Sequence, residues 1–323
     1  MARLMLKAMA CCSVILGAAA AHAGVLIGAH IGFQNNPNFI TDVTDFETSI
    51  GRKLSIDSDY DDWGAFPDTP RIVWDIQTGH IPMQSWRVLF NYLNPLACAT
   101  GAAISAGTYD TKIDQQAAAA KAFGSTLLVR YNYEMANNVE NTCFTGFLIT
   151  KDNSAQAGQI YIAAWRHIVG RFRAVGATNV KWVWAPGAQT WADGTWKYFY
   201  PGSAYVDWVG IDDYNIVDTP SSFVTDSGMP QFIANAPTLG KPLMVTENGA
   251  YNDPKLSPDP QTTWINTAHA YMKNSSVISA YVYWNDSAGP VLPPPYTGSG
   301  YLLQGTGLAA FKSMANDPAV IGH

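Results

Sequence analysis

The sequence predicts an α/β protein folded as a single (β/α)₈ TIM barrel. Short runs typical of strands alternate with longer helical patterns, eight such runs occur, and they are spread over about 300 residues without a break in composition. An open doubly wound sheet is the alternative. The sequence disfavours it, because no GxGxxG or GxxxxGK phosphate loop occurs.

Residues 1–23 are expected to form a signal peptide. Two basic residues give it a positive start, Ala8–Ala20 is small and apolar, and Ala21-His22-Ala23 has the small-x-small pattern of a cleavage site. The apolar stretch is too short to span a bilayer. We therefore expect a secreted protein, periplasmic or extracellular, with a catalytic barrel domain over residues 24–323.

The strands are expected where apolar or β-branched residues cluster between turn signals. The fourth and fifth strands are separated by Gln159–Val175, whose apolar residues have helical spacing, and Gly176 follows as a helix-ending glycine. The eight expected strands are Val25–Ile31, Arg71–Ile76, Ile81–Trp86, Thr126–Tyr133, Val180–Ala185, Val206–Ile211, Pro242–Glu247 and Ala280–Trp284.

Two segments are interpreted as loops. Asp57–Asp62 has acids at alternate positions but lacks the glycine and final glutamate of a calcium loop, so it is interpreted as a solvated rim loop. Gly289–Gly300 follows the eighth strand and contains three consecutive prolines. Loops after the strands form the active face of such barrels, so this one is expected to wall a cleft.

Charge excludes two classes of partner. The chain has 19 Lys and Arg against 25 Asp and Glu and no basic run, which argues against nucleic acid and anionic membranes. Its 11 Trp and 16 Tyr fit either a large core or a cleft that stacks sugars. We expect a monomer.

Cysteine usage agrees with export. Cys98 and Cys143 are the cysteines of the expected mature chain, and they are predicted to form one disulfide. A lipoprotein anchor at Cys11 or Cys12 is a weaker alternative, since the apolar run lies mostly after them. No HExxH or CxxC motif occurs, so no metal site is expected.

Two glutamates end apolar runs on opposite walls of the expected barrel. Glu134 follows the fourth strand and Glu247 ends the seventh. One such glutamate is often only the first residue of a loop, but two of them three strands apart predict a shared site. Hydrolysis of a glycosidic bond needs a proton donor and a second carboxylate, which lie ~5–5.5 Å apart in retaining enzymes.

Neighbouring residues fit this chemistry. Arg130 has the same parity as Glu134 along the strand, so it points the same way and is expected to keep a carboxylate ionised. Tyr214 ends the sixth strand, where it either hydrogen-bonds the nucleophile or packs on the rim. Trp284 ends the eighth strand and is either a sugar platform or a core residue.

The chain resembles glycoside hydrolase family 26, in a clan of barrels whose catalytic glutamates end strands four and seven. The resemblance implies that Glu134 is the acid/base, that Glu247 is the nucleophile and that no cofactor takes part. It also implies that Arg130 and Tyr214 support the nucleophile and that Trp86 and Trp284 help form the sugar site. The matching segments are 81–86 with 94–95, 105–110, 130–135, 181–186, 200–202, 206–215 and 241–249.

The residues beside the acid/base depart from the family pattern. The family usually has His before the acid/base and Asn two residues after it, whereas this chain has Tyr133 and Ala136, with Asn137 one position further. These positions contact the sugar near its 2-hydroxyl, so Tyr133 and Asn137 are candidate substrate-binding residues. The resemblance implies an endo-acting enzyme on a polysaccharide, by default β-1,4-mannan, with mixed-linkage β-glucan and xylan as alternatives.

The sequence disfavours two other classes of function. A non-catalytic glycan-binding protein on a barrel scaffold would keep the aromatic surface but should have lost a carboxylate, and both are present. An esterase is disfavoured because no GxSxG nucleophile elbow occurs.

Overall fold

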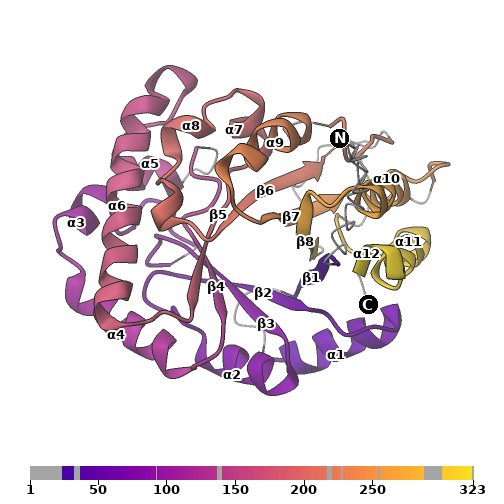
Figure 1. Cartoon of the computed structure of the whole chain (residues 1–323), viewed down its shortest axis with the longest axis horizontal. Coiled ribbons are helices and arrows are strands. Elements are labelled where there is room, and N and C mark those ends of the chain that lie inside the picture. Colours follow the sequence, from indigo (N-terminus) through magenta and orange to yellow (C-terminus); the bar gives the residue numbers. More distant parts are fainter. Residues whose placement is uncertain are drawn as a thin grey trace, which may run out of the picture.

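The computed structural model confirms the predicted fold class. It describes residues 24–32, 37–91, 93–136, 140–216, 220–226, 228–253, 255–286 and 300–321. Eight parallel strands close into one barrel in chain order, and helices surround it (Figure 1). The strands are β1 (Leu26–Ile31), β2 (Ile56–Asp61), β3 (Ile81–Trp86), β4 (Leu127–Tyr131), β5 (Val180–Trp184), β6 (Trp208–Asn215), β7 (Leu243–Ala250) and β8 (Ile278–Asn285).

The helices form the outer layer, with α11 beside α1 and α10 where the ring closes (Figure 1). The predicted helix before Gly176 is α6, and Gly176 ends it in the left-handed conformation at φ 83°. The α-helices are α1 (Phe39–Ile50), α2 (Thr69–Thr78), α3 (Gly101–Ser105), α4 (Asp110–Ala122), α5 (Glu140–Thr145), α6 (Ser154–Val175), α7 (Ala188–Ala192), α8 (Trp196–Phe199), α9 (Met229–Asn235), α10 (Pro260–Asn274), α11 (Gly305–Ala315) and α12 (Pro318–Ile321). Three 3₁₀ turns are η1 (Lys151–Asn153), η2 (Ser203–Tyr205) and η3 (Ala236–Leu239).

Alternate residues of each strand pack two separate cores. Inward-facing residues fill the barrel, among them Ile56, Met83 and Leu128. Outward-facing residues pack on the helices in a larger cluster that includes Val129, Trp165 and Phe172. The barrel interior is therefore filled with side chains, which leaves the mouth at the strands' carboxyl ends for a functional site.

The predicted second strand is wrong. Arg71–Ile76 lies within α2, and the true β2 is Ile56–Asp61, so most of the expected rim loop Asp57–Asp62 is a strand. The alternate acids of β2 are buried because Arg71 faces them from α2: its Nε and Nη2 each donate to Asp57 at 2.8 Å, and its Nη1 lies 3.4 Å from Asp59. Burial still dominates at Asp59, whose pKa is raised to about 6.

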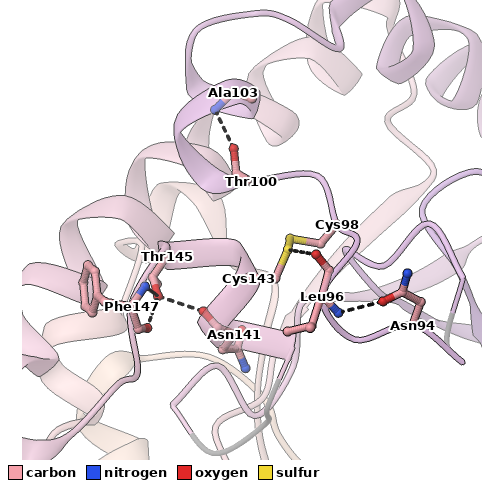
Figure 2. Close-up of a disulfide and its surroundings, with 9 residues drawn as sticks. All are labelled: Asn94, Leu96, Cys98, Thr100, Ala103, Asn141, Cys143, Thr145 and Phe147. Carbon is pink, nitrogen blue, oxygen red and sulfur yellow. Dashed lines mark hydrogen bonds between the residues drawn. A yellow bond between two sulfur atoms is a disulfide. The ribbon is translucent and has the colours of Figure 1, made fainter.

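The predicted disulfide is confirmed. Cys98 and Cys143 are bonded, with their Cα atoms 6.1 Å apart, and they join the chain after β3 to α5 (Figure 2). No helix among the described residues is long and apolar enough to cross a membrane. The expected signal peptide and the expected wall loop, except Gly300, lie outside the described residues.

Candidate active site

Three carboxylates meet at the mouth of the barrel. Glu134 follows β4, Asp212 lies in β6 and Glu247 lies in β7. One oxygen from each carboxylate lies within 4.8 Å of the others. Glu247 is only 7% exposed and Asp212 2%, whereas Glu134 is partly exposed. The structure therefore brings together the two predicted catalytic glutamates.

Glu247 receives hydrogen bonds on both of its oxygens. Arg130 Nη2 and the Tyr60 hydroxyl both donate to Oε1, and the Tyr214 hydroxyl donates to Oε2 at 2.6 Å. Three donors, one of them cationic, stabilise negative charge on this buried carboxylate. Such a group is suited to act as an anionic nucleophile rather than as a proton donor.

Arg130 organises the floor of the site. Its guanidinium is fully buried, with Nη1 donating to Asp212 at 2.7 Å and Nε donating to Ser85 Oγ at 3.1 Å. The Tyr133 ring lies against it, 4.0 Å from Cζ to the ring centroid. Burial raises the pKa of Asp212 to about 6, and Arg130 opposes that shift. One cation thus lies between two buried carboxylates and fixes the position of Glu247 relative to the barrel.

The Arg130 guanidinium also affects whether the three carboxylates could bind a metal ion. Glu134, Asp212 and Glu247 are close enough together for their oxygens to ligate one ion. However, the Arg130 guanidinium donates directly to Asp212 and to Glu247 and supplies the positive charge between them. The donor set therefore fits an internal ion-pair network better than a resident cation.

The backbone around Glu134 is strained. Asn132 and Glu134 have φ values of 40° and 47°, in the left-handed region that non-glycine residues rarely adopt. Each such residue costs on the order of 1–3 kcal/mol and persists only where its surroundings hold it. Here the Asn132 amide donates to Trp86 O and the Glu134 amide donates to Ala185 O, both at 2.9 Å. The strain is concentrated at the chain segment that presents Glu134.

Aromatic rings line the mouth. Tyr60, Tyr133 and Trp284 belong to one cluster, and the Tyr60 and Tyr133 rings meet edge to face at 5.7 Å. Trp284 stacks on the His30 ring at 5.9 Å, and Tyr214 meets Trp284 edge-on at 6.2 Å. Trp284 is only partly buried, which suits a stacking platform.

His30 lies behind this wall at the end of β1. Its Nδ1 donates to Ser58 O at 2.8 Å, and its ring meets Tyr60 edge-on at 4.8 Å. Burial lowers the pKa of His30 to about 4, so the ring is neutral at ordinary pH. A neutral ring with Nδ1 protonated presents Nε2 as a hydrogen-bond acceptor.

One predicted sugar-site residue is not part of this cluster. Trp86 is fully buried in the outer core, stacked between Trp63 at 4.9 Å and Phe66 at 4.5 Å. Its ring lies on the helix side of β3, so the expectation that it contacts sugar is corrected. Asn137 lies outside the described residues.

Sequence reasoning missed Tyr60, Asp212 and His30. Tyr60 was missed because β2 was interpreted as a loop, although Ile56, Ser58 and Tyr60 alternate with acids at the period of a strand. Asp212 was seen only as part of a strand end, and the irregular β6–β7 register after Ile211 that places it could not be inferred. His30 is the penultimate residue of the first predicted strand, so its position near the carboxyl end of that strand could have indicated that it lies near the site.

This chain is similar to proteins of known family. Residues 149–285 match the model of glycosyl hydrolase family 26. Endoglucanase H of Acetivibrio thermocellus is 30% identical over 234 residues, which is 70% of this chain and 24% of that protein. The chain therefore spans about a quarter of that relative's length.

Solved structures with the same fold include three mannanases. The Bacillus subtilis mannanase BCman has a TM-score of 0.62 at 18% identity, covering 89% of this chain and 85% of its own. A family 26 β-mannanase from Bacteroides ovatus has a TM-score of 0.61 at 17% identity, with coverage of 93% and 91%. A family 26 endo-β-1,4-mannanase from Bacillus sp. JAMB-750 has a TM-score of 0.63 at 15% identity, with coverage of 92% and 86%. At these identities the likeness concerns the fold alone.

Proposed function

Because the chain belongs to glycosyl hydrolase family 26, we propose that it is a secreted, endo-acting glycoside hydrolase that cleaves a β-linked polysaccharide with retention of configuration. The observation that carries the proposal is the pair Glu134 and Glu247, since one carboxylate oxygen of each lies within 4.8 Å of the other. A retaining pair is ~5–5.5 Å apart, whereas an inverting pair is ~6.5–9.5 Å apart to leave room for water.

In the first step, Glu247 attacks the anomeric carbon as the carbon–oxygen bond to the leaving sugar breaks. Glu134 gives its proton to that leaving oxygen, so the leaving sugar departs as an alcohol. The donors on Glu247 hold its attacking oxygen in place. The product is a glycosyl ester on Glu247 and an ionised Glu134.

In the second step, water replaces the leaving sugar. Glu134 now takes a proton from the water, whose oxygen attacks the anomeric carbon and releases Glu247 as a carboxylate. Two inversions give net retention, and Glu134 ends protonated as it began. The partial exposure of Glu134 suits a group that must meet both the leaving sugar and water.

The sequence-based expectation for the substrate is β-mannan. We propose β-glucan as the preferred substrate instead. The relative at 30% identity carries the name of an endoglucanase, whereas the mannanase structures are 15–18% identical. In addition, Tyr133 replaces the histidine that usually precedes the acid/base. Its ring packs on Arg130 and Tyr60 beside the nucleophile, so it alters the wall that meets the sugar.

The test is release of reducing sugar from mixed-linkage β-glucan, β-mannan, glucomannan and xylan by the wild type, Glu247→Ala and Glu134→Ala. Asp114→Asn serves as a control, because that carboxylate pairs with Arg171 on the outer helices. We expect the wild type and the control to cut β-glucan, with retention seen by NMR of the first product. Both glutamate variants should lose at least about 100-fold.

Two outcomes would overturn the proposal. Binding of a polymer by the wild type without any cleavage would favour a glycan-binding protein. Cleavage with inversion would refute the roles proposed for the two glutamates, although the protein would still be a glycosidase.

Azide added to Glu134→Ala should accelerate turnover of an activated aryl glycoside and give a β-glycosyl azide, which identifies the acid/base directly.

A further inference from the structure

The peptide groups on either side of Glu134 are tied to two different elements. On the amino side, its N–H donates to Ala185 O just beyond β5, at 2.9 Å. On the carboxyl side, its carbonyl accepts from Asn141 Nδ2 of α5, at 3.3 Å. Because the φ of 47° is unfavourable for glutamate, the surroundings must hold this backbone, and these two contacts are part of what holds it.

Helix α5 is a short element that needs external support. It has six residues, too few to be stable alone. Phe144 anchors it in the core, where its ring leaves no room for a side chain at Gly101 of α3. Two residues from Asn141, Cys143 is bonded to Cys98 (Figure 2).

Figure 2 shows that Cys143 and Asn141 lie on the same short helix, where the Thr145 hydroxyl donates to the Asn141 carbonyl. Asn141 is 1% exposed, so water has little access to replace its contact with Glu134. The disulfide joins this helix to the chain segment that follows β3.

We propose that Asn141 is a positioning residue for the acid/base Glu134 and that the Cys98–Cys143 disulfide holds α5 so that Asn141 can act. The inference rests on the proposed function, because it takes Glu134 as the acid/base. It adds that the orientation of the Glu134 carboxyl group depends on the Asn141 side-chain amide and on the Cys98–Cys143 disulfide.

The proposal predicts a selective defect. A sugar leaves poorly without a proton, whereas 2,4-dinitrophenolate leaves without one. A misplaced Glu134 should therefore slow the cleavage of polymer, but not the first step on a dinitrophenyl glycoside. Since kcat/KM covers the steps through the first irreversible one, it reports this difference without the later attack of water.

The test compares kcat/KM for the polymer that the wild type cleaves and for the 2,4-dinitrophenyl glycoside of its disaccharide. For Asn141→Ala we expect a fall of about 10- to 100-fold on polymer, since ångström-scale misplacement of a catalytic group costs this much. On the aryl glycoside we expect a change within about twofold. The double variant Cys98→Ser with Cys143→Ser should show the same selectivity.

Asn179→Ala is the matched control. Its amide donates to Ala120 O and Ser125 O at 2.9 Å, at the opposite end of the barrel from Glu134. Any activity that it loses should be lost equally on both substrates. Phosphine reduction of folded wild type, followed by circular dichroism, repeats the disulfide test without a mutation.

Equal losses on both substrates in Asn141→Ala, or full polymer activity in it, would overturn the inference. Failure of the proposed function looks different. In that case the wild type would cleave neither substrate, or Glu134→Ala would show no selectivity for the leaving group.

Discussion

Tyr60→Phe tests the network around Glu247 at a residue that sequence reasoning missed. The change removes the hydroxyl that donates to Oε1 and leaves the ring in place. A hydrogen bond to a charged group contributes about 1.5–3 kcal/mol, which corresponds to about 10- to 150-fold in rate. Both residues are buried, at 8% and 7% exposure, so water does not readily replace the hydroxyl.

The contacts of Glu247 narrow the expected fall in rate and predict how it compares with the fall in Tyr214→Phe. Oε1 keeps its bond from Arg130 when Tyr60 loses its hydroxyl, so we expect a fall near the lower limit, about 10-fold. Among the described residues, Tyr214 is the hydrogen-bond donor to Oε2, so Tyr214→Phe should fall further, about 100-fold. In Tyr60→Phe the fall should appear in kcat with little change in KM, because the hydroxyl contacts the enzyme and not the sugar.

The assay is steady-state hydrolysis of the preferred polymer, with melting temperatures measured in parallel. Tyr131→Phe is the control: its hydroxyl is buried in the same strand as Arg130 and has no hydrogen-bond partner among the described residues. We expect unchanged activity in this control. An unchanged kcat in Tyr60→Phe, or a larger loss there than in Tyr214→Phe, would refute the reasoning.

Three further predictions concern Arg71 and Asp59, which form the ion pair between α2 and β2, and Trp284 at the barrel mouth. Arg71→Met should destabilise the fold by about 3–5 kcal/mol in urea unfolding, because it leaves Asp57 and Asp59 buried without their cation. Folded Asp59 keeps its proton to about pH 6 against 3.8 for the ordinary side chain, so its contribution to stability falls as pH rises between these values. Asp59→Asn should therefore flatten the decline of the urea midpoint across that window, and an unchanged slope would contradict the shift. Trp284→Ala should raise KM roughly tenfold by removing an apolar platform, and an unchanged KM would place Trp284 outside the sugar site.

The barrel could be predicted because most of its strands are apolar on both faces. Strands such as β4 and β7 pack inward on the barrel and outward on helices, so they stand out as continuous apolar runs. β2 could not be recognised this way, because its outward residues are acids that depend on Arg71. That pairing links residues 14 positions apart through the fold, and a local pattern does not contain it.

That Glu134 and Glu247 lie close together could be predicted for a related reason, but the residues that contact Glu247 could be predicted only in part. Strand ends converge at one face, so two glutamates at strand ends imply a site whatever the details of the loops. Which side chains contact Glu247 depends on how the barrel strands are aligned with one another, and a single strand's sequence does not show this. Tyr60 reaches Glu247 across the barrel mouth, 187 residues away in sequence. The expectation for Trp86 came from the family resemblance, and it was wrong because Trp86 lies on the opposite face of β3 from Met83, which faces the barrel interior.

The surroundings of the two glutamates differ in a way that suits the different roles proposed for them. Glu247 lies within a regular strand, nearly buried, with three donors on its oxygens, so it is held rigidly and stabilised as an anion. Glu134 lies beyond its strand, partly exposed, on a strained backbone tied at both peptide groups. A nucleophile must keep its charge and position, whereas an acid/base must exchange protons with a leaving group and with water. The asymmetry therefore supports the proposed roles, Glu247 as the nucleophile and Glu134 as the acid/base, and the strained backbone is the segment that carries the Glu134 side chain.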